Sequence, residues 1–161
     1  MREYIMGVDP GRKGAYAIVE TIEGSFVGMD DAFSDDPSMP KNLLTLMSEV
    51  SIVVVERPLA YPGTPAQSLI TLAESYGAAV ALARCAGVRT LLLPTAAQWK
   101  RKLGVTGEKR TSVEAAMRIF GLTGRPPRHD LCEAALIAYY GYLKLRESSC
   151  EGASFLETSS K

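Results

Sequence analysis

Short apolar runs predict the strands of this chain. Three of them follow one another closely, from Tyr4 to Val8, from Ala15 to Val19 and from Ser25 to Met29, with turn residues between them. Strands so closely spaced are typical of an antiparallel meander. The run from Ser51 to Val55 is apolar and β-branched, which suits a central strand buried on both faces. A further buried strand is predicted from Val88 to Leu93.

Apolar residues at helical spacing predict five helices between and after these strands. Their expected ranges are Lys41 to Ser48, Thr64 to Ala86, Thr95 to Leu103, Glu108 or Ser112 to Phe120, and His129 or Asp130 to about Leu145. The remaining residues, 147–161, are rich in serine and are predicted to form a disordered tail. One domain over residues 1–146 is therefore expected.

The order of these elements predicts an α/β fold with a mixed five-stranded sheet flanked by helices. Three antiparallel strands are followed by two strands in crossover units, which is the order of elements in the ribonuclease-H-like fold.

Length and composition set limits on the class of protein. The chain has 161 residues, 47% of them hydrophobic, which is enough for a globular core without a metal or disulfide staple. Its three cysteines form no CxxC pair, so a zinc ribbon and a secreted disulfide scaffold are excluded. No apolar run reaches the roughly 18 residues of a membrane span. We expect a cytoplasmic protein with no membrane partner, encoded by a phage or a bacterium, or an organellar protein if this is a trimmed mature chain.

Basic residues are concentrated in one part of the chain. The formal net charge is zero, but residues 100–128 hold eight basic and two acidic side chains, a net charge of +6. This asymmetry is compatible with an anionic partner on one face, although such a run of charge is more often only a solvated surface.

Four carboxylates occur where predicted elements begin or end. Asp9 and Glu56 each follow a buried strand directly, and Asp130 and Glu133 share one face at the start of the last helix. Such hard oxygen ligands suit Mg²⁺ or Mn²⁺. Three of them also have an ordinary structural interpretation: Asp9 as a turn residue, Asp130 as a helix N-cap, and Glu133 as its partner in the first turn. Glu56 is harder to explain in this way, because an unpaired carboxylate at the end of a buried strand is costly.

Four motifs in a consistent order resemble the RuvC-type Holliday-junction resolvases. They are IMGVDPGRKGA from Ile5, VVVERP from Val53, LPTAAQWKR from Leu93, and HDLCEAALIA from His129, and together they span about residues 4–143. The Pro-x₄-Trp-Lys segment and Lys109 are closer to the branch that contains the chloroplast resolvase and its phage and bacterial relatives.

The resemblance implies a crossover-junction endodeoxyribonuclease, a hydrolase that cuts four-way DNA junctions in recombination and repair. Two Mg²⁺ or Mn²⁺ ions roughly 4 Å apart would stabilise both the attacking and the leaving oxygen. Asp9 would bridge the two ions, Glu56 would complete one site, and Asp130 with Glu133 would complete the other. Lys109 is the expected cation near the scissile phosphate, and a solvated lysine is its alternative.

The resemblance does not decide which residue at the start of the last helix faces the metal. Relatives often carry one more residue between the histidine and the second acid, so either His129 or Asp130 could face the metal. Because magnesium prefers oxygen to imidazole, we expect Asp130 to be the ligand and His129 to assist nearby.

Further residues are expected to bind DNA or to form a dimer. Trp99 could stack on a base, although a core anchor is the more common use of a single tryptophan. A junction has approximate two-fold symmetry, so a homodimer is expected, with the helix from Ser68 to Ala86 in its interface. The predicted contacts to backbone phosphates are Lys100, Arg101, Lys102, Arg110 and Arg128.

Three other classes compete with this interpretation. A YqgF-type RNA-processing nuclease begins with a similar Gly-x-Asp-Pro-Gly strand but lacks the Trp-Lys segment. Sugar-kinase and actin-type ATPases share the Gly-x-Asp-x-Gly turn but need two such domains. A non-catalytic junction-binding protein would not need four clustered carboxylates, which repel DNA.

Overall fold

A mixed five-stranded sheet forms the centre of the computed structural model, which describes residues 3–36 and 40–157. The strands lie in the order β3-β2-β1-β4-β5. The first three are antiparallel neighbours, and β4 and β5 continue the sheet in parallel with β1. This arrangement confirms the α/β fold predicted from the sequence. The strands are β1 (Tyr4–Asp9), β2 (Ala15–Glu20), β3 (Phe26–Asp30), β4 (Ile52–Val55) and β5 (Thr90–Leu92).

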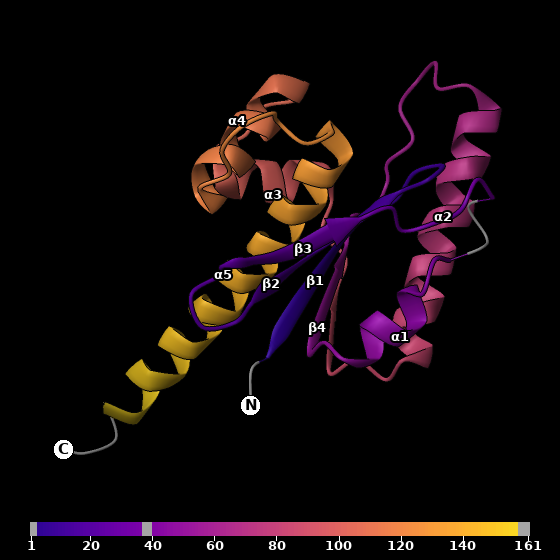
Figure 1. Ribbon diagram of the computed structural model, residues 1–161. Coiled ribbons are helices and arrows are strands. Elements are labelled where there is room, and N and C mark those ends of the chain that lie inside the picture. The colour runs from indigo at the N-terminus through magenta and orange to yellow at the C-terminus, as the bar shows by residue number, and fades with distance from the viewer. Residues whose placement is uncertain (1–2, 37–39, 158–161) are drawn as a thin grey trace.

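Helices cover both faces of the sheet (Figure 1). Two of them lie on one face, and the other three lie on the opposite face. The first pair consists of α1 (Leu43–Ser48) and α2 (Ala66–Cys85). The second group consists of α3 (Ala96–Leu103), α4 (Lys109–Phe120) and α5 (His129–Glu157).

The alternation of side chains along β1 divides the core into two parts. Met6 and Val8 belong to the core beneath α1 and α2, whereas Ile5 belongs to the core beneath α3, α4 and α5. Successive side chains of a strand point to opposite faces, so Gly7 and Asp9 share the face of Ile5. Asp9 therefore lies on the side of the sheet that α5 covers.

Gly7 allows α5 to approach β1 very closely. A Cβ atom added at Gly7 would lie 2.3 Å from the carbonyl oxygen of Ala134 in α5. The absence of a side chain at this position brings the first turns of α5 against the end of β1. The helix start, where the sequence places two acids, is thereby held near Asp9.

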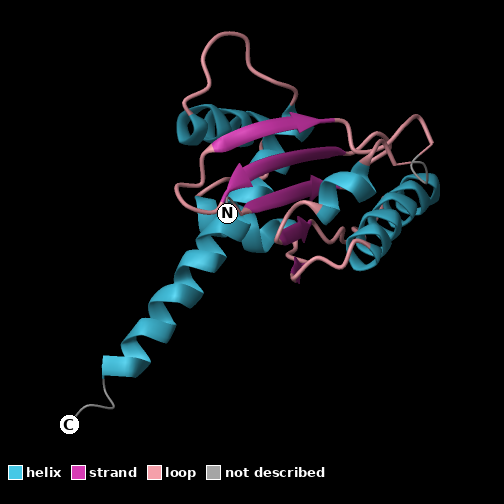
Figure 2. Ribbon diagram, turned by 60° about the horizontal axis from the view of Figure 1, so that its bottom comes forward, coloured by secondary structure: helices cyan, strands magenta, loops and turns pink. Residues whose placement is uncertain are grey.

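The last helix is longer than the sequence pattern predicts. It continues past Leu145 to Glu157, and its C-terminal half extends away from the rest of the molecule (Figure 2). Glu147 pairs with Lys102 of α3 and with Lys144, and these contacts hold its pKa at about 2. The pair with Lys102 tethers α5 to α3 beyond the predicted end of the helix. The boundary of the domain at residue 146 and the disordered tail stay predictions. None of the helices within the described ranges is long and apolar enough to cross a membrane.

Candidate active site

Asp9 and Glu56 lie side by side at one edge of the sheet. Strands β1 and β4 are parallel and place Val8 opposite Val55, and the Glu56 N–H donates to the Val8 carbonyl oxygen at 3.0 Å. Each acid comes directly after the last residue pair between β1 and β4, so the parallel register brings the two acids together. Ile52 and Val54 belong to the core beneath α5, and the same alternation directs Glu56 to the face that Asp9 occupies.

Asp130 and Glu133 reach this edge from the start of α5. Burial raises the pKa of the Asp9 carboxyl well above its ordinary value, and repulsion from Glu56, Glu133 and Asp130 raises it further. The ammonium group of Lys100 opposes this shift. All four carboxylates predicted from the sequence therefore belong to one electrostatic cluster, which we call the carboxylate cluster.

Glu133 is the most extensively paired member of the carboxylate cluster. Its Oε1 atom accepts from Lys100 Nζ at 2.6 Å and from Ser112 Oγ at 2.9 Å. His129 Nε2 lies 3.2 Å from the same oxygen, one helical turn earlier. The side chain is buried, so these partners replace the water that it has lost.

The Glu56 carboxylate accepts a hydrogen bond from Trp99. The Trp99 indole Nε1 donates to Glu56 Oε2 at 2.6 Å, and the Trp99 side chain is fully buried. Burial raises the pKa of Glu56, and this hydrogen bond acts against the shift because it favours the ionised form. Trp99 is thus a core residue, and its polar end faces the carboxylate cluster.

Arg128 joins Asp130 to a second acid outside the cluster. Its Nε and Nη2 donate to the two Asp130 carboxylate oxygens at 3.0 and 2.7 Å, and Nη2 also reaches Asp31 Oδ1 at 2.6 Å. The hydrogen bond from Arg128 lowers the pKa of Asp31. Lys41 Nζ lies 3.6 Å from the other side of Asp31, so a chain of alternating charges leads from the cluster to the start of α1.

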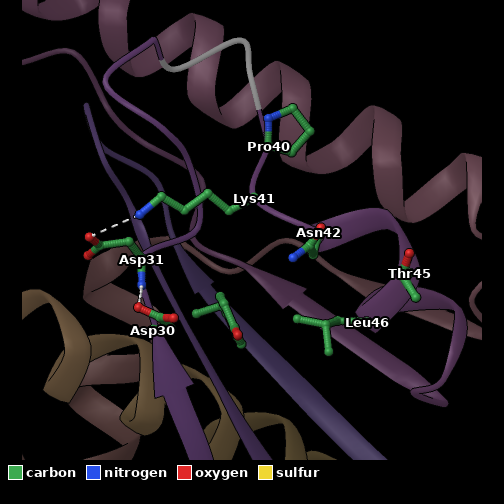
Figure 3. Close-up of a pocket in the computed structure, with 8 residues that line it drawn as sticks. Asp30, Asp31, Pro40, Lys41, Asn42, Thr45 and Leu46 are labelled. Atoms are coloured by element: carbon green, nitrogen blue, oxygen red, sulfur yellow. Dashed lines mark hydrogen bonds and ion pairs between the residues drawn. The ribbon is translucent and has the colours of Figure 1, made fainter.

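A cavity of about 670 Å³ lies at the far end of this charge chain (Figure 3). Figure 3 shows Asp31 between Lys41 and Asp30, with Asn42, Thr45 and Leu46 along the other side. Tyr16 also lines this cavity and belongs to the core beneath α1 and α2. The cavity is therefore on the opposite face of the sheet from Asp9 and Glu56.

The predicted basic residues take three different positions. Lys100 points into the carboxylate cluster. Arg128 is half exposed, but its guanidinium group is paired with two acids. Arg101 and Lys102 line a groove with Gln98, Tyr140 and Lys144. Lys109 and Arg110 are exposed at the start of α4, and Arg110 pairs with Glu114 at 3.2 Å.

Two residues of this site, Ser112 and Asp31, are not predicted from the sequence. The sequence pattern suggests Ser112 only as a helix start, but α4 begins at Lys109 and Ser112 lies buried within it. Asp31 had no assigned role. Lys100 and Arg128 contact acids of the carboxylate cluster, and the predicted role of Lys109 near a scissile phosphate stays a prediction.

Within the described residues, no three His, Cys, Asp and Glu side chains lie close enough to form a metal centre as they stand. The hydrogen bonds explain this arrangement. Glu56, Glu133 and Asp130 are each drawn toward a donor, namely Trp99, Lys100 and Arg128. Mutual repulsion separates carboxylates that have no shared cation.

The sheet order, the helices on both faces and the acids at the strand ends define a ribonuclease-H-like fold. Two solved structures of Thermus thermophilus RuvC share it, one of them in complex with a Holliday junction substrate. Each is 19% identical to this chain and covers 90% of it and 96% of its own length, with TM-scores of 0.69 for the complex and 0.66 for the other. No protein-family model and no curated protein matches the chain. The resemblance to RuvC-type resolvases is thus confirmed at the level of the fold, and the branch stays a prediction.

Proposed function

We propose that the protein is a Holliday-junction resolvase, a metal-dependent endonuclease that cuts four-way DNA junctions. One observation carries the proposal. Asp9, Glu56, Asp130 and Glu133 come from three distant segments and meet at one edge of the sheet, where their charges act on Asp9 together. The fold is shared with a RuvC whose structure contains a junction substrate, which supports the same substrate class here.

The donor set of the carboxylate cluster fits two Mg²⁺ or Mn²⁺ ions. Its acids are hard oxygen ligands, and their repulsion at Asp9 is the kind that a divalent cation relieves. Asp9 with Glu56 would hold one ion, and Asp9 with Asp130 and Glu133 would hold the other. When bound, the ions would supply an activated water and stabilise the attacking and leaving oxygens.

The surrounding residues would prepare the acids for this role. His129 Nε2 would donate its proton to Glu133 Oε1, which can only accept, and so fix the direction of that carboxylate. Lys100 lies 2.6 Å from the same oxygen. Its ammonium would compensate Glu133 in the absence of substrate and would turn toward a phosphate oxygen when DNA enters.

Contacts to the DNA backbone would come from exposed cations around the cluster. Arg101 and Lys102 line the groove between α3 and α5, and Lys109 and Arg110 mark the start of α4. Such contacts supply affinity that does not depend on sequence. Arg128 and Lys100 would join them only after releasing their acids.

A homodimer would match the two-fold symmetry of a junction. The outer face of α2 is a suitable surface, because Ile70, Ala73, Gly77 and Ala81 are exposed at helical spacing while Ala79 and Ala83 are buried against the sheet. Ala73→Glu should convert a dimer to a monomer in sedimentation equilibrium. Val27→Glu, at an exposed apolar position on β3, is the matched control.

The decisive experiment compares substrates directly. Purified protein is incubated with a synthetic four-way DNA junction, a matched duplex and a hairpin RNA, each with and without Mg²⁺. We expect Mg²⁺-dependent cuts in the junction alone, and none with Asp9→Asn or Glu56→Gln. Cleavage of the hairpin RNA alone would favour an RNA-processing nuclease, and tight junction binding without cleavage would favour a junction-binding protein.

A further inference from the structure

Trp99 is the single tryptophan of the chain, and it lies beneath the carboxylate cluster. Its side chain is 0% exposed and belongs to the same core as Val54 and Leu136. A buried indole needs one acceptor for its N–H. Here that acceptor is Glu56 Oε2 at 2.6 Å, a charged atom of the candidate active site.

Both ends of this hydrogen bond are anchored to the same part of the backbone. Arg57, the residue after Glu56, donates its N–H to the Pro94 carbonyl oxygen at 2.8 Å, just before α3 begins. Residues Arg57 and Thr95 form a parallel bridge. At the start of α3, Gln98 Oε1 accepts from the Thr95 N–H at 2.8 Å. The indole and the carboxylate are therefore held in one register by main-chain contacts.

Two neighbouring residues of α3 contact different acids of the carboxylate cluster. Trp99 contacts Glu56, and Lys100 contacts Glu133. Lys100 brings a full charge on a flexible stem, whereas the indole brings one donor in a fixed plane. A fixed neutral donor neither cancels the charge of Glu56 nor competes with a metal ion for both oxygens.

We propose that Trp99 is a positioning residue that holds Glu56 Oε2 and presents Oε1 to the metal ion of the active site. This inference rests on the proposed function, because it assigns the orientation of one of the four acids. Outer contacts of this kind typically change metal affinity by about 10- to 100-fold. Loss of the N–H should therefore weaken metal binding without removing it.

A single tryptophan allows an isosteric test. In a tryptophan auxotroph, Trp99 is replaced by 3-benzothienylalanine, which keeps the ring shape but carries sulfur in place of the N–H. The matched control is 5-fluorotryptophan, which keeps the N–H. Binding of Mn²⁺ to the full-length proteins is measured by electron paramagnetic resonance of the free ion. We expect the benzothienyl protein to bind about 10- to 100-fold more weakly and the fluorotryptophan protein to bind normally.

Two genetic variants extend the test. Trp99→Phe should weaken Mn²⁺ binding as the benzothienyl protein does, and Phe33→Leu should leave it unchanged because Phe33 is a buried aromatic of the other core. Unchanged circular dichroism identifies the folded variants. In the protein with natural Trp99, the substitution Glu56→Gln should shift the Trp99 fluorescence emission, because it changes the acceptor of the indole N–H.

The outcomes separate this inference from the proposed function. Equal Mn²⁺ affinity in the benzothienyl and wild-type proteins would overturn the positioning role while the metal-dependent nuclease stands. Absence of Mn²⁺ binding in the wild type would overturn the metal-dependent function, and the positioning role with it. Weaker binding in the benzothienyl protein alone supports both.

Discussion

Gly7 and Ala138 lie in backbone contact, because a Cβ atom on Gly7 would stand 2.3 Å from the Ala138 nitrogen. Gly7 is two residues before Asp9 on β1, and Ala138 follows Glu133 on α5. Backbone atoms cannot rotate away as a side chain can. The spacing between β1 and α5 is therefore set by one missing methyl group, and with it the distance between Asp9 and the acids of the helix.

Gly7→Ala should destabilise the protein and abolish cleavage. The added methyl overpacks a rigid contact, at a cost of about 1–3 kcal/mol, and moves α5 away from Asp9. Gly28→Ala is the matched control, because a Cβ there meets nothing within 4 Å. Urea unfolding and junction cleavage measure both effects, and wild-type values for Gly7→Ala would refute the role of the close approach.

Asp9→Asn should stabilise the metal-free protein increasingly as pH rises. The Asp9 carboxyl titrates near 3.8 when unperturbed, and burial and the neighbouring acids raise its pKa well above that in the folded state. The folded state therefore holds the proton more tightly, so wild type loses stability as pH rises through the folded pKa. Each unit of difference is worth about 1.4 kcal/mol.

Urea unfolding in EDTA over a range of pH compares Asp9→Asn with wild type. The difference in unfolding free energy should grow with pH and then level off above the folded pKa. A difference in unfolding free energy that does not change with pH would show that the neighbouring acids and burial do not raise the pKa of Asp9. In the same variant, junction cleavage should be lost while junction affinity stays the same or rises.

Lys100→Ala and Arg101→Ala should impair different properties, cleavage and junction binding respectively, although the two residues are adjacent. Lys100 contacts Glu133 inside the cluster, whereas Arg101 lines the outer groove. Loss of Arg101 should lower the salt dependence of junction binding by about one charge. Loss of Lys100 should reduce single-turnover cleavage more strongly than it changes that slope. Equal effects in both assays would mean that Lys100 is another surface cation.

The same salt titration tests the exposed basic residues. Lys102→Ala or Arg110→Ala should each flatten the slope by roughly one charge. Junction affinity that does not depend on salt would show that the basic segment is only a solvated face.

Asp130→Asn should be as inactive as Asp9→Asn, and His129→Ala should lose about ten- to a hundredfold in rate while keeping its metal requirement. His129 contacts Glu133, whereas Arg128 donates to both carboxylate oxygens of Asp130. Single-turnover cleavage of a junction measures both variants. The reverse order of severity would identify His129 as the metal-facing residue.

Periodicity predicted the elements that carry the acids because those elements are buried. Strand β4 is apolar throughout, so its end at Glu56 is visible in the sequence, and Asp130 with Glu133 follow from helical spacing. The parallel pairing of β1 and β4 then follows from the order of elements. The positions of these acids could therefore be predicted from the local sequence pattern and the order of elements alone.

The partners of the acids were not predictable in the same way. Helix α3 is short and carries Lys100, Arg101 and Lys102 in a row, so spacing alone does not show which cation turns inward. Ser112 reads as a helix start, although its hydroxyl is buried against Glu133. The length of α5 was not predicted because one of the contacts that supports it, the ion pair between Glu147 and Lys102 of α3, is tertiary.

The order of the four acids along the chain has a consequence for how the protein is made. Asp9 and Glu56 are synthesised well before Asp130 and Glu133, which come last of the four. A nascent or prematurely terminated chain that stops before α5 holds only half of the carboxylate cluster. Under the proposed function, such incomplete products would be unable to cut nucleic acid, and activity would begin only when α5 docks against Gly7 of β1.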